Sequence, residues 1–156
     1  MNFFAWFKPL TGTLIGVLAI TAPAFAFPFS QSEIENYVGL GIRAGLNDDA
    51  AALLDSKFEL TSFNQGSVSI RPAILIGNDF EGRIPVSFDH VLAEEFLIFG
   101  GGGFAYNFDE SDFDPMLTGG VDMALSERLI LNVEGNLIFK SDDTDAEVAA
   151  SINWLF

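Results

Sequence analysis

Charged side chains stand within the apolar segments of this chain, and they are the first candidates for chemistry. Five of them alternate with apolar neighbours at mid-segment positions: Arg43, Glu59, Arg71, Asp122 and Glu134. A charge removed from bulk water needs a partner, because an unpaired buried ion is costly. We therefore predict that these side chains form an ion-pair network inside the fold. A narrow ion path along the same side chains is the alternative.

The single histidine, His90, lies close to Ser87 and Asp89, which together supply a base, a nucleophile and an acid. In an extended segment, successive side chains point to opposite faces. Ser87 and Asp89 then share one face and His90 points to the other, which is unfavourable for proton transfer between them. We predict no catalytic residue, and a lipid-modifying enzyme around His90 is the less favoured alternative.

The run Gly39-Leu40-Gly41-Ile42-Arg43-Ala44 matches the pattern G-x-G-x-x-A. A dinucleotide site needs this pattern at a strand-to-helix turn. Here the alternation of apolar residues continues through the run, so the glycines are interpreted as part of a strand. No nucleotide or other cofactor is expected, and the absence of cysteine excludes disulfides and thiolate metal sites.

Acidic residues dominate the charge and gather in predicted loops. The net charge is −15, which leaves no basic patch to neutralise phosphates and excludes nucleic acid as a partner. One loop carries Asp109, Glu110, Asp112 and Asp114, whose carboxylates suit hard divalent cations. The spacing and glycine of an EF-hand are missing, so a solvated loop is favoured. Divalent cations at this loop are kept as candidate partners.

Apolar residues at every second position define the elements that must hold these groups. Eight such segments are predicted, near 36–46, 56–63, 67–77, 82–89, 95–108, 116–125, 128–140 and 148–156. The phase of 95–108 is ambiguous, because aromatic residues occur on both of its faces. Pro72 cannot donate a ladder hydrogen bond, so we expect a bulge in the third segment.

Eight strands joined in sequence predict an all-β fold, an eight-stranded antiparallel up-and-down barrel over residues 36–156, since closure removes both sheet edges. Charged residues and glycines share the face opposite the apolar one, as a narrow polar lumen requires. This favours a transmembrane barrel with lipids as partners. A soluble periplasmic barrel with a small ligand in an apolar lumen is the alternative.

The amino terminus fits export from the cytoplasm. Residues 1–26 have the features of a cleavable signal peptide, with Lys8, the apolar core 14–20 and the cleavage pattern Ala24-Phe25-Ala26. Residues 27–35 are interpreted as a short leader. Together with the barrel pattern, the signal peptide predicts the cell outer membrane as the location.

Several stretches resemble the small outer-membrane β-barrel superfamily, which includes the barrel domain of OmpA. They are Tyr37-Val38-Gly39-Leu40-Gly41, the glycine-rich run 99–106, the run 119–129 and the ending Ile152-Asn153-Trp154-Leu155-Phe156. The resemblance implies insertion by the barrel assembly machinery, which would read a C-terminal strand that carries Trp154 and Phe156. With only 2 Trp and 2 Tyr, an aromatic girdle would rest mainly on Phe. We expect a non-enzymatic outer-membrane protein with an envelope structural or surface-interaction role.

Overall fold

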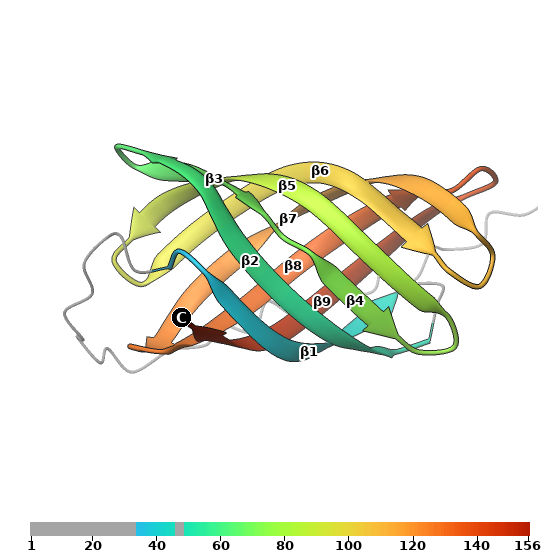
Figure 1. The fold of residues 1–156 in the computed structure, drawn as a ribbon, viewed down its shortest axis with the longest axis horizontal. Helices are drawn as coiled ribbons and strands as arrows, with labels where there is room; N and C mark the ends of the chain where they lie inside the picture. Colours follow the sequence, from blue (N-terminus) through green and yellow to red (C-terminus); the bar gives the residue numbers. More distant parts are fainter. Residues whose placement is uncertain (1–33, 46–48) are drawn as a thin grey trace, which may run out of the picture.

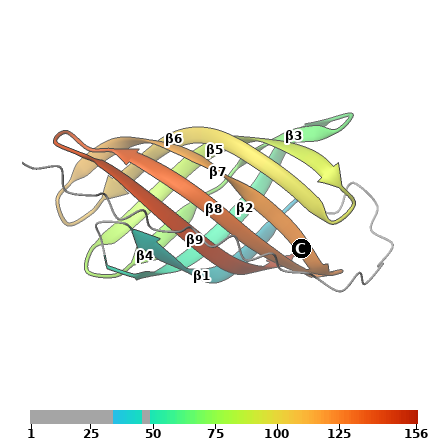
Figure 2. The same ribbon diagram turned by 180° about the vertical axis from the view of Figure 1, so that it is seen from behind.

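The computed structural model describes residues 34–45 and 49–156, and these residues form strands and turns (Figures 1 and 2). The predicted signal peptide, 1–26, and nearly all of the predicted leader, 27–35, lie outside the described residues. Within the described ranges, no helix is long and apolar enough to cross a membrane.

The strands form one closed antiparallel ring. They are β1 (Tyr37–Gly45), β2 (Ala51–Phe63), β3 (Gly66–Ile70), β4 (Ala73–Ile76), β5 (Phe80–Ala93), β6 (Phe96–Asn107), β7 (Asp112–Ser126), β8 (Leu129–Phe139) and β9 (Thr144–Leu155). Sequential strands pair with one another, except that β3 and β4 each pair with β2 and β5 instead. β1 pairs with both β2 and β9 (Figure 1). The sheet therefore has no open edge along its length.

β3 and β4 are two parts of one barrel strand. Ile70 lies opposite Val86 of β5. Ala73, three residues after Ile70, lies opposite Arg83, which is three residues before Val86, so the register with β5 is continuous. The register with β2 continues across the same gap. The gap falls at Arg71 and Pro72, where proline lacks the N–H that the ladder needs. The barrel is thus eight-stranded, as predicted, whereas the predicted bulge at Pro72 is wrong: pairing is interrupted there without a register shift.

Several strands extend further than the alternation indicated. β2 begins at Ala51, so Asp55 lies in a strand rather than in the predicted loop. β7 begins at Asp112, so Asp112 and Asp114 lie on a strand, and only 108–111 connect β6 to β7. Backbone pairing does not need an apolar face, so the ladders continue beyond the alternating residues. The loops at the end away from the C-terminus are correspondingly short.

The two faces of the wall separate apolar from polar side chains. On β1, Leu40 and Ile42 are 64% and 67% exposed and point outward, while Tyr37 is buried inside. The ambiguous phase of β6 is resolved: Leu97 and Phe99 point into the lumen, and Ile98 between them points outward. An apolar outer wall around a polar interior excludes the soluble barrel with an apolar lumen.

Aromatic pairs occur on the outer wall toward both ends of the barrel. Phe80 packs on Phe108, and Phe104 stacks on Phe113, with ring centroids 5.0 and 4.5 Å apart. Toward the other end, the pairs are Phe63 with Phe88 and Phe58 with Phe156. Phenylalanine supplies most of these rings, as the composition led us to expect.

Glycine permits the close approach of strands that a narrow barrel demands. A Cβ on the inward-facing Gly101 would lie 2.0 Å from the carbonyl oxygen of Val86 on β5. A Cβ on Gly100, its neighbour, would meet no atom within 4 Å. At this height of β6 the requirement for glycine is therefore specific to the inner position, where the curved strands crowd one another.

Candidate functional site: the charged lumen

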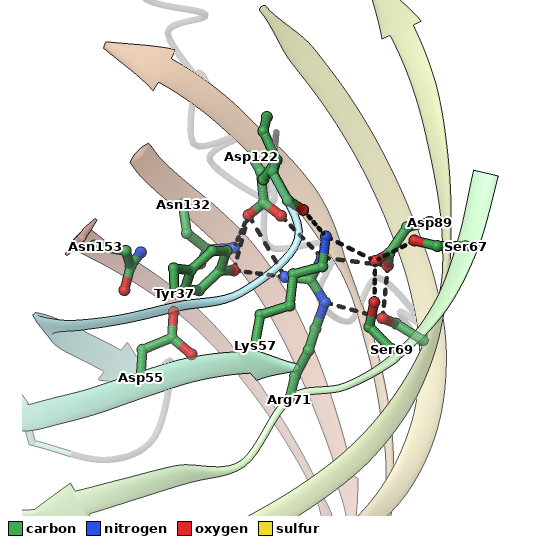
Figure 3. Close-up of polar contacts among 12 residues, drawn as sticks. Tyr37, Asp55, Lys57, Ser67, Ser69, Arg71, Asp89, Asp122, Asn132 and Asn153 are labelled. Carbon is green, nitrogen blue, oxygen red and sulfur yellow. Dashed lines mark hydrogen bonds and ion pairs between the residues drawn. The ribbon is translucent and has the colours of Figure 1, made fainter. Parts of the chain in front are cut away.

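Arg71 is the centre of a buried cluster in the lumen (Figure 3). Arg71 keeps the inward phase of Ser69 and Ala73 across the break between β3 and β4, and its Nη2 lies 2.8 Å from Asp122 Oδ2 and 3.2 Å from Asp89 Oδ1. Its Nη1 donates to the Tyr37 hydroxyl at 2.7 Å, and Tyr37 donates in turn to Asp122 Oδ1 at 3.0 Å. One cation thus joins β5 and β7 across the interior.

Lys57 is the second cation of this cluster. Its side chain is 0% exposed, and Nζ lies 3.1 Å from Asp89 Oδ2. The same ammonium donates to the carbonyl oxygen of Ile34 at 2.7 Å. Lys57 and Arg71 are register partners, so two positive charges sit side by side on the inner wall and two carboxylates, Asp89 and Asp122, oppose them. We call Tyr37, Lys57, Arg71, Asp89 and Asp122 the central cluster.

Hydroxyl, amide and aromatic groups complete the central cluster. Ser69 and Ser87 each donate to Asp89 at 2.6 Å, and Asn132 Nδ2 donates to Asp122 Oδ1 at 2.7 Å. The guanidinium carbon of Arg71 lies 3.5 Å from the ring centroid of Phe99, a cation–π contact in a site shielded from water. The charges are therefore both paired and hydrogen-bonded, which offsets much of their desolvation.

A second group of ion pairs lies further along the lumen. Arg83 Nη1 and Arg43 Nε contact Glu147 at 2.7 and 3.3 Å, and Arg83 also pairs with Glu81. We call Arg43, Glu81, Arg83 and Glu147 the outer cluster. Apolar side chains also fill the lumen toward this end; they are Ala51, Leu53, Ala73, Leu75 and Ala149, and, separately, Ala105, Met116 and Ile138. The interior thus holds both ion pairs and clusters of buried apolar side chains.

Solved structures match the chain over most of its length, whereas no family model and no curated protein matches it. A structure from "De novo design of transmembrane beta-barrels" has a TM-score of 0.62 at 14% identity, covering 78% of this chain and 94% of that chain. Ail, the attachment invasion locus protein of Yersinia pestis, has a TM-score of 0.55 at 9% identity, covering 78% and 96%. The N-terminal β-barrel domain of OprF from Pseudomonas aeruginosa gives 0.54 at 6%, with the same coverage.

The chain folds as a small outer-membrane β-barrel. The expected resemblance to this type of barrel is confirmed at the level of the fold. An outer-membrane barrel of this size presents an apolar band to lipid, and the exposed apolar side chains of β1 to β9 supply that band. The fold and the apolar outer wall together suit a barrel surrounded by lipid.

The structure brings only part of the predicted charge set together. Arg71 and Asp122 pair directly, and Arg43 joins the outer cluster instead of the central one. Glu134 accepts a hydrogen bond from Asn136 Nδ2 at 2.9 Å and joins no ion pair among the described residues. Glu59 lies half-buried on β2 and likewise joins no ion pair there.

Lys57, Asp89 and the outer acid Glu147 are lumen charges that the sequence alone did not select. Lys57 follows the same alternation as Glu59, and Asp89 the same alternation as Ser87, so the signal for their face was available. To predict that these three residues form ion pairs, one must know how far along the barrel axis each side chain lies. That position depends on the registers between strands, which alternation does not give.

The remaining candidates lie away from this lumen chemistry. His90 is exposed on the outer wall, whereas Ser87 and Asp89 are buried inside, so the three do not form a catalytic group. Gly39 and Gly41 lie in strand β1, paired with β2 and β9, and not at a helix. Trp154 is 51% exposed on the outer side of β9, and Phe156, which follows the end of that strand, is 71% exposed.

The acidic residues between β6 and β7 do not converge. Asp109 Oδ2 accepts a hydrogen bond from the backbone N–H of Phe80 at 2.8 Å, which holds the turn against β5. Glu110 and Asp112 are exposed, and Asp114 is half-buried. Among the described residues, no group of three or more His, Cys, Asp or Glu side chains has an arrangement that would hold a metal ion.

Proposed function

We propose that this protein is a non-enzymatic envelope barrel whose lumen is closed and whose role is structural. The observation that supports this most directly is the central cluster, in which Arg71 connects Tyr37 of β1, Asp89 of β5 and Asp122 of β7. An eight-stranded barrel is just wide enough for side chains to fill its interior. Ion pairs that cross such an interior are expected to block the passage of solutes.

Conductance across a planar bilayer tests this role. The wild-type barrel is expected to give no steady current, since the cluster fills the cross-section. Replacing both Arg71 and Asp122 by Ala removes the main cross-barrel pair, and openings are expected in that variant if it folds. A wild-type protein that conducts steadily, with the same current after substitution at Arg43 alone and at Arg71 alone, would contradict a closed lumen.

A surface-interaction role is the second candidate, supported by the charge of one end of the barrel. At the end away from the C-terminus, the exposed acids among the described residues are Asp49, Asp79, Asp109, Glu110, Asp112, Asp142 and Asp143. Ail has been crystallised in complex with the heparin analogue sucrose octasulfate. A polyanion would be repelled by this acidic end, so a surface partner of this protein would be cationic or bridged by divalent cations. Binding of a polylysine peptide, lost in high salt, tests the candidate.

Export and insertion follow the same proposal. Residues 1–26 would be removed as a signal peptide, leaving 27–35 as a leader before the barrel of 36–156. The amino-terminal sequence of the protein purified from membranes tests the cleavage site after Ala26. The exposed Trp154 and Phe156 support recognition of the last strand by the barrel assembly machinery. Deletion of Phe156 is expected to lower the amount of folded barrel in the membrane.

A further inference from the structure

We propose that the lumen binds a hard, oxygen-preferring cation between Asp55 and Glu134. Both carboxylates belong to inward-facing positions, on β2 and β8, and Asp55 is 3% exposed. Asp55 accepts a hydrogen bond from Ser151 of β9, and Ala149, the preceding inward-facing residue of β9, is the register partner of Glu134. Among the described residues neither acid joins an ion pair. Two neighbouring acids in a desolvated interior need a compensating positive charge.

The protein's own lumen cations are engaged elsewhere. Lys57 contacts Asp89, and Arg71 contacts both Asp89 and Asp122. Arg43 and Arg83 contact Glu147. Asp55 instead accepts a hydrogen bond from Ser151 Oγ at 2.8 Å, and Glu134 accepts one from Asn136. Neutral donors leave both negative charges in place, so an external cation is the missing partner.

Unpartnered oxygens accompany each of the two acids. Asn136 directs its amide N–H₂ to Glu134, because a carboxylate only accepts, and this leaves its Oδ1 buried with no donor. Ser151 donates its only hydroxyl proton to Asp55, so Asn153 must present its N–H₂ to Ser151. Asn153 Oδ1 is then buried without a donor as well.

The strand registers place these oxygens beside the carboxylates. Thr118 lies opposite Asn136 on the inner wall, and its buried Oγ1 also has no partner among the described residues. Gly120 lies opposite Glu134, and Gly39 lies opposite Asp55, so no side chain at either position covers the acids. Asn153 Oδ1 lies over Gly39, which brings it next to Asp55 in the register.

Oxygen donors of this kind select the class of cation. Carboxylate, amide and hydroxyl oxygens are the ligands of hard cations, and a divalent ion carries the charge that the two acids require. Asn136 pairs with Glu147 and Asn153 with Ile130 in the β8–β9 ladder, so the two amides lie on either side of the carboxylates and the ion would take one of them at most. The flexible coordination of Ca²⁺ tolerates such a mixed set of oxygens better than the strict octahedral geometry of Mg²⁺. We call Asp55, Thr118, Glu134, Asn136, Ser151 and Asn153 the oxygen patch, and Ca²⁺ is its expected ligand.

Thermal unfolding of the whole barrel, refolded into detergent with EDTA or with Ca²⁺, tests the proposal. Refolding in the presence of the ion lets it reach the lumen before the barrel closes. Excess Ca²⁺ is expected to raise the unfolding temperature by about 10 °C at ~100-fold excess over Kd. The double variant Asp55→Asn/Glu134→Gln should lose this shift, and the single variant Glu134→Gln should weaken it if the double variant does not fold.

A matched control separates the lumen from the acidic end of the barrel. The variant Glu110→Gln/Asp112→Asn makes the same two chemical changes at exposed positions and should keep the full Ca²⁺ shift. Loss of the shift in this control, or its persistence without the lumen acids, would overturn the proposal. A second result would also overturn the proposal: the unfolding temperature of the wild-type barrel does not change with Ca²⁺ and rises only on acidification. Protons, and not a cation, would then neutralise Asp55 and Glu134.

Discussion

The central cluster and the oxygen patch lie in the same lumen, yet the carboxylates of the first have cationic partners and those of the second do not. Asp89 lies within 3.2 Å of two cationic side chains and accepts hydrogen bonds from two serines. Asp55 has a serine and no cation within ion-pair distance in the part of the chain that the structure describes. The difference teaches that burial alone does not define a structural ion pair. We expect the central cluster to stabilise the folded barrel and the oxygen patch to bind a cation.

The largest effect is expected from removing the cation of the central cluster. Arg71→Met keeps most of the side-chain volume but leaves Asp89 and Asp122 short of their shared partner. Removing one partner of a buried ion pair typically costs about 3–5 kcal/mol. We expect the unfolding free energy in detergent, measured by urea titration, to fall by that amount. Arg128→Met, at an exposed turn, is the control and should change it by less than ~0.5 kcal/mol.

Lys57→Met sharpens the comparison, because it removes the other cation while Arg71 still holds Asp89. We expect an intermediate loss of about 2 kcal/mol, since Asp89 keeps one ion pair and its serine donors. The same urea titration measures it. A loss equal to that of Arg71→Met would indicate that the two cations act as one unit, and a double-mutant cycle would then give a large coupling energy.

A smaller effect is expected at Phe99, which lies under the Arg71 guanidinium. Phe99→Leu keeps the site apolar and removes the cation–π contact, which is worth about 2 kcal/mol when desolvated. In the background of Arg71→Met, the same change should cost less, because the cation is absent. Equal costs in both backgrounds would assign the role of Phe99 to packing alone.

The smallest effect is expected from the exposed acids. Asp142→Asn should change the unfolding free energy by less than ~0.5 kcal/mol, because this carboxylate is solvated. Thermal unfolding at low and high salt checks it. A large destabilisation would mean that the acidic end contributes to the barrel as strongly as the lumen does.

The alternation of apolar residues was sufficient to predict the barrel and the inner face of most strands. It did not reveal the start of β2, because Ala51 and Leu53 point into an apolar part of the lumen while Leu54 points outward. With apolar residues on both faces, the period of two disappears. Asp55 is the first polar inner residue of that strand, so it was assigned to a loop and the oxygen patch was not foreseen.

The membership of the ion clusters needed information that alternation does not carry. Lys57 and Glu59 share a pattern, but only Lys57 reaches Asp89. Which charges meet depends on the stagger of the strands. Arg71 keeps the inward phase of Ser69 and Ala73 across the interruption at Pro72, and the stagger decides which carboxylates it reaches. Aromatic residues on both faces of β6 hid the inward Phe99 in the same way.

Asp89→Asn and Asp55→Asn, compared in one urea titration with EDTA present, test the central contrast most directly. Both variants make the same chemical change at a buried carboxylate of the lumen. The paired site should lose about 3–5 kcal/mol, because Lys57 and Arg71 are left short of negative charge. Asp55→Asn should be neutral or stabilising, because it removes an unpaired negative charge. Equal losses at the two sites would contradict the distinction between the central cluster and the oxygen patch.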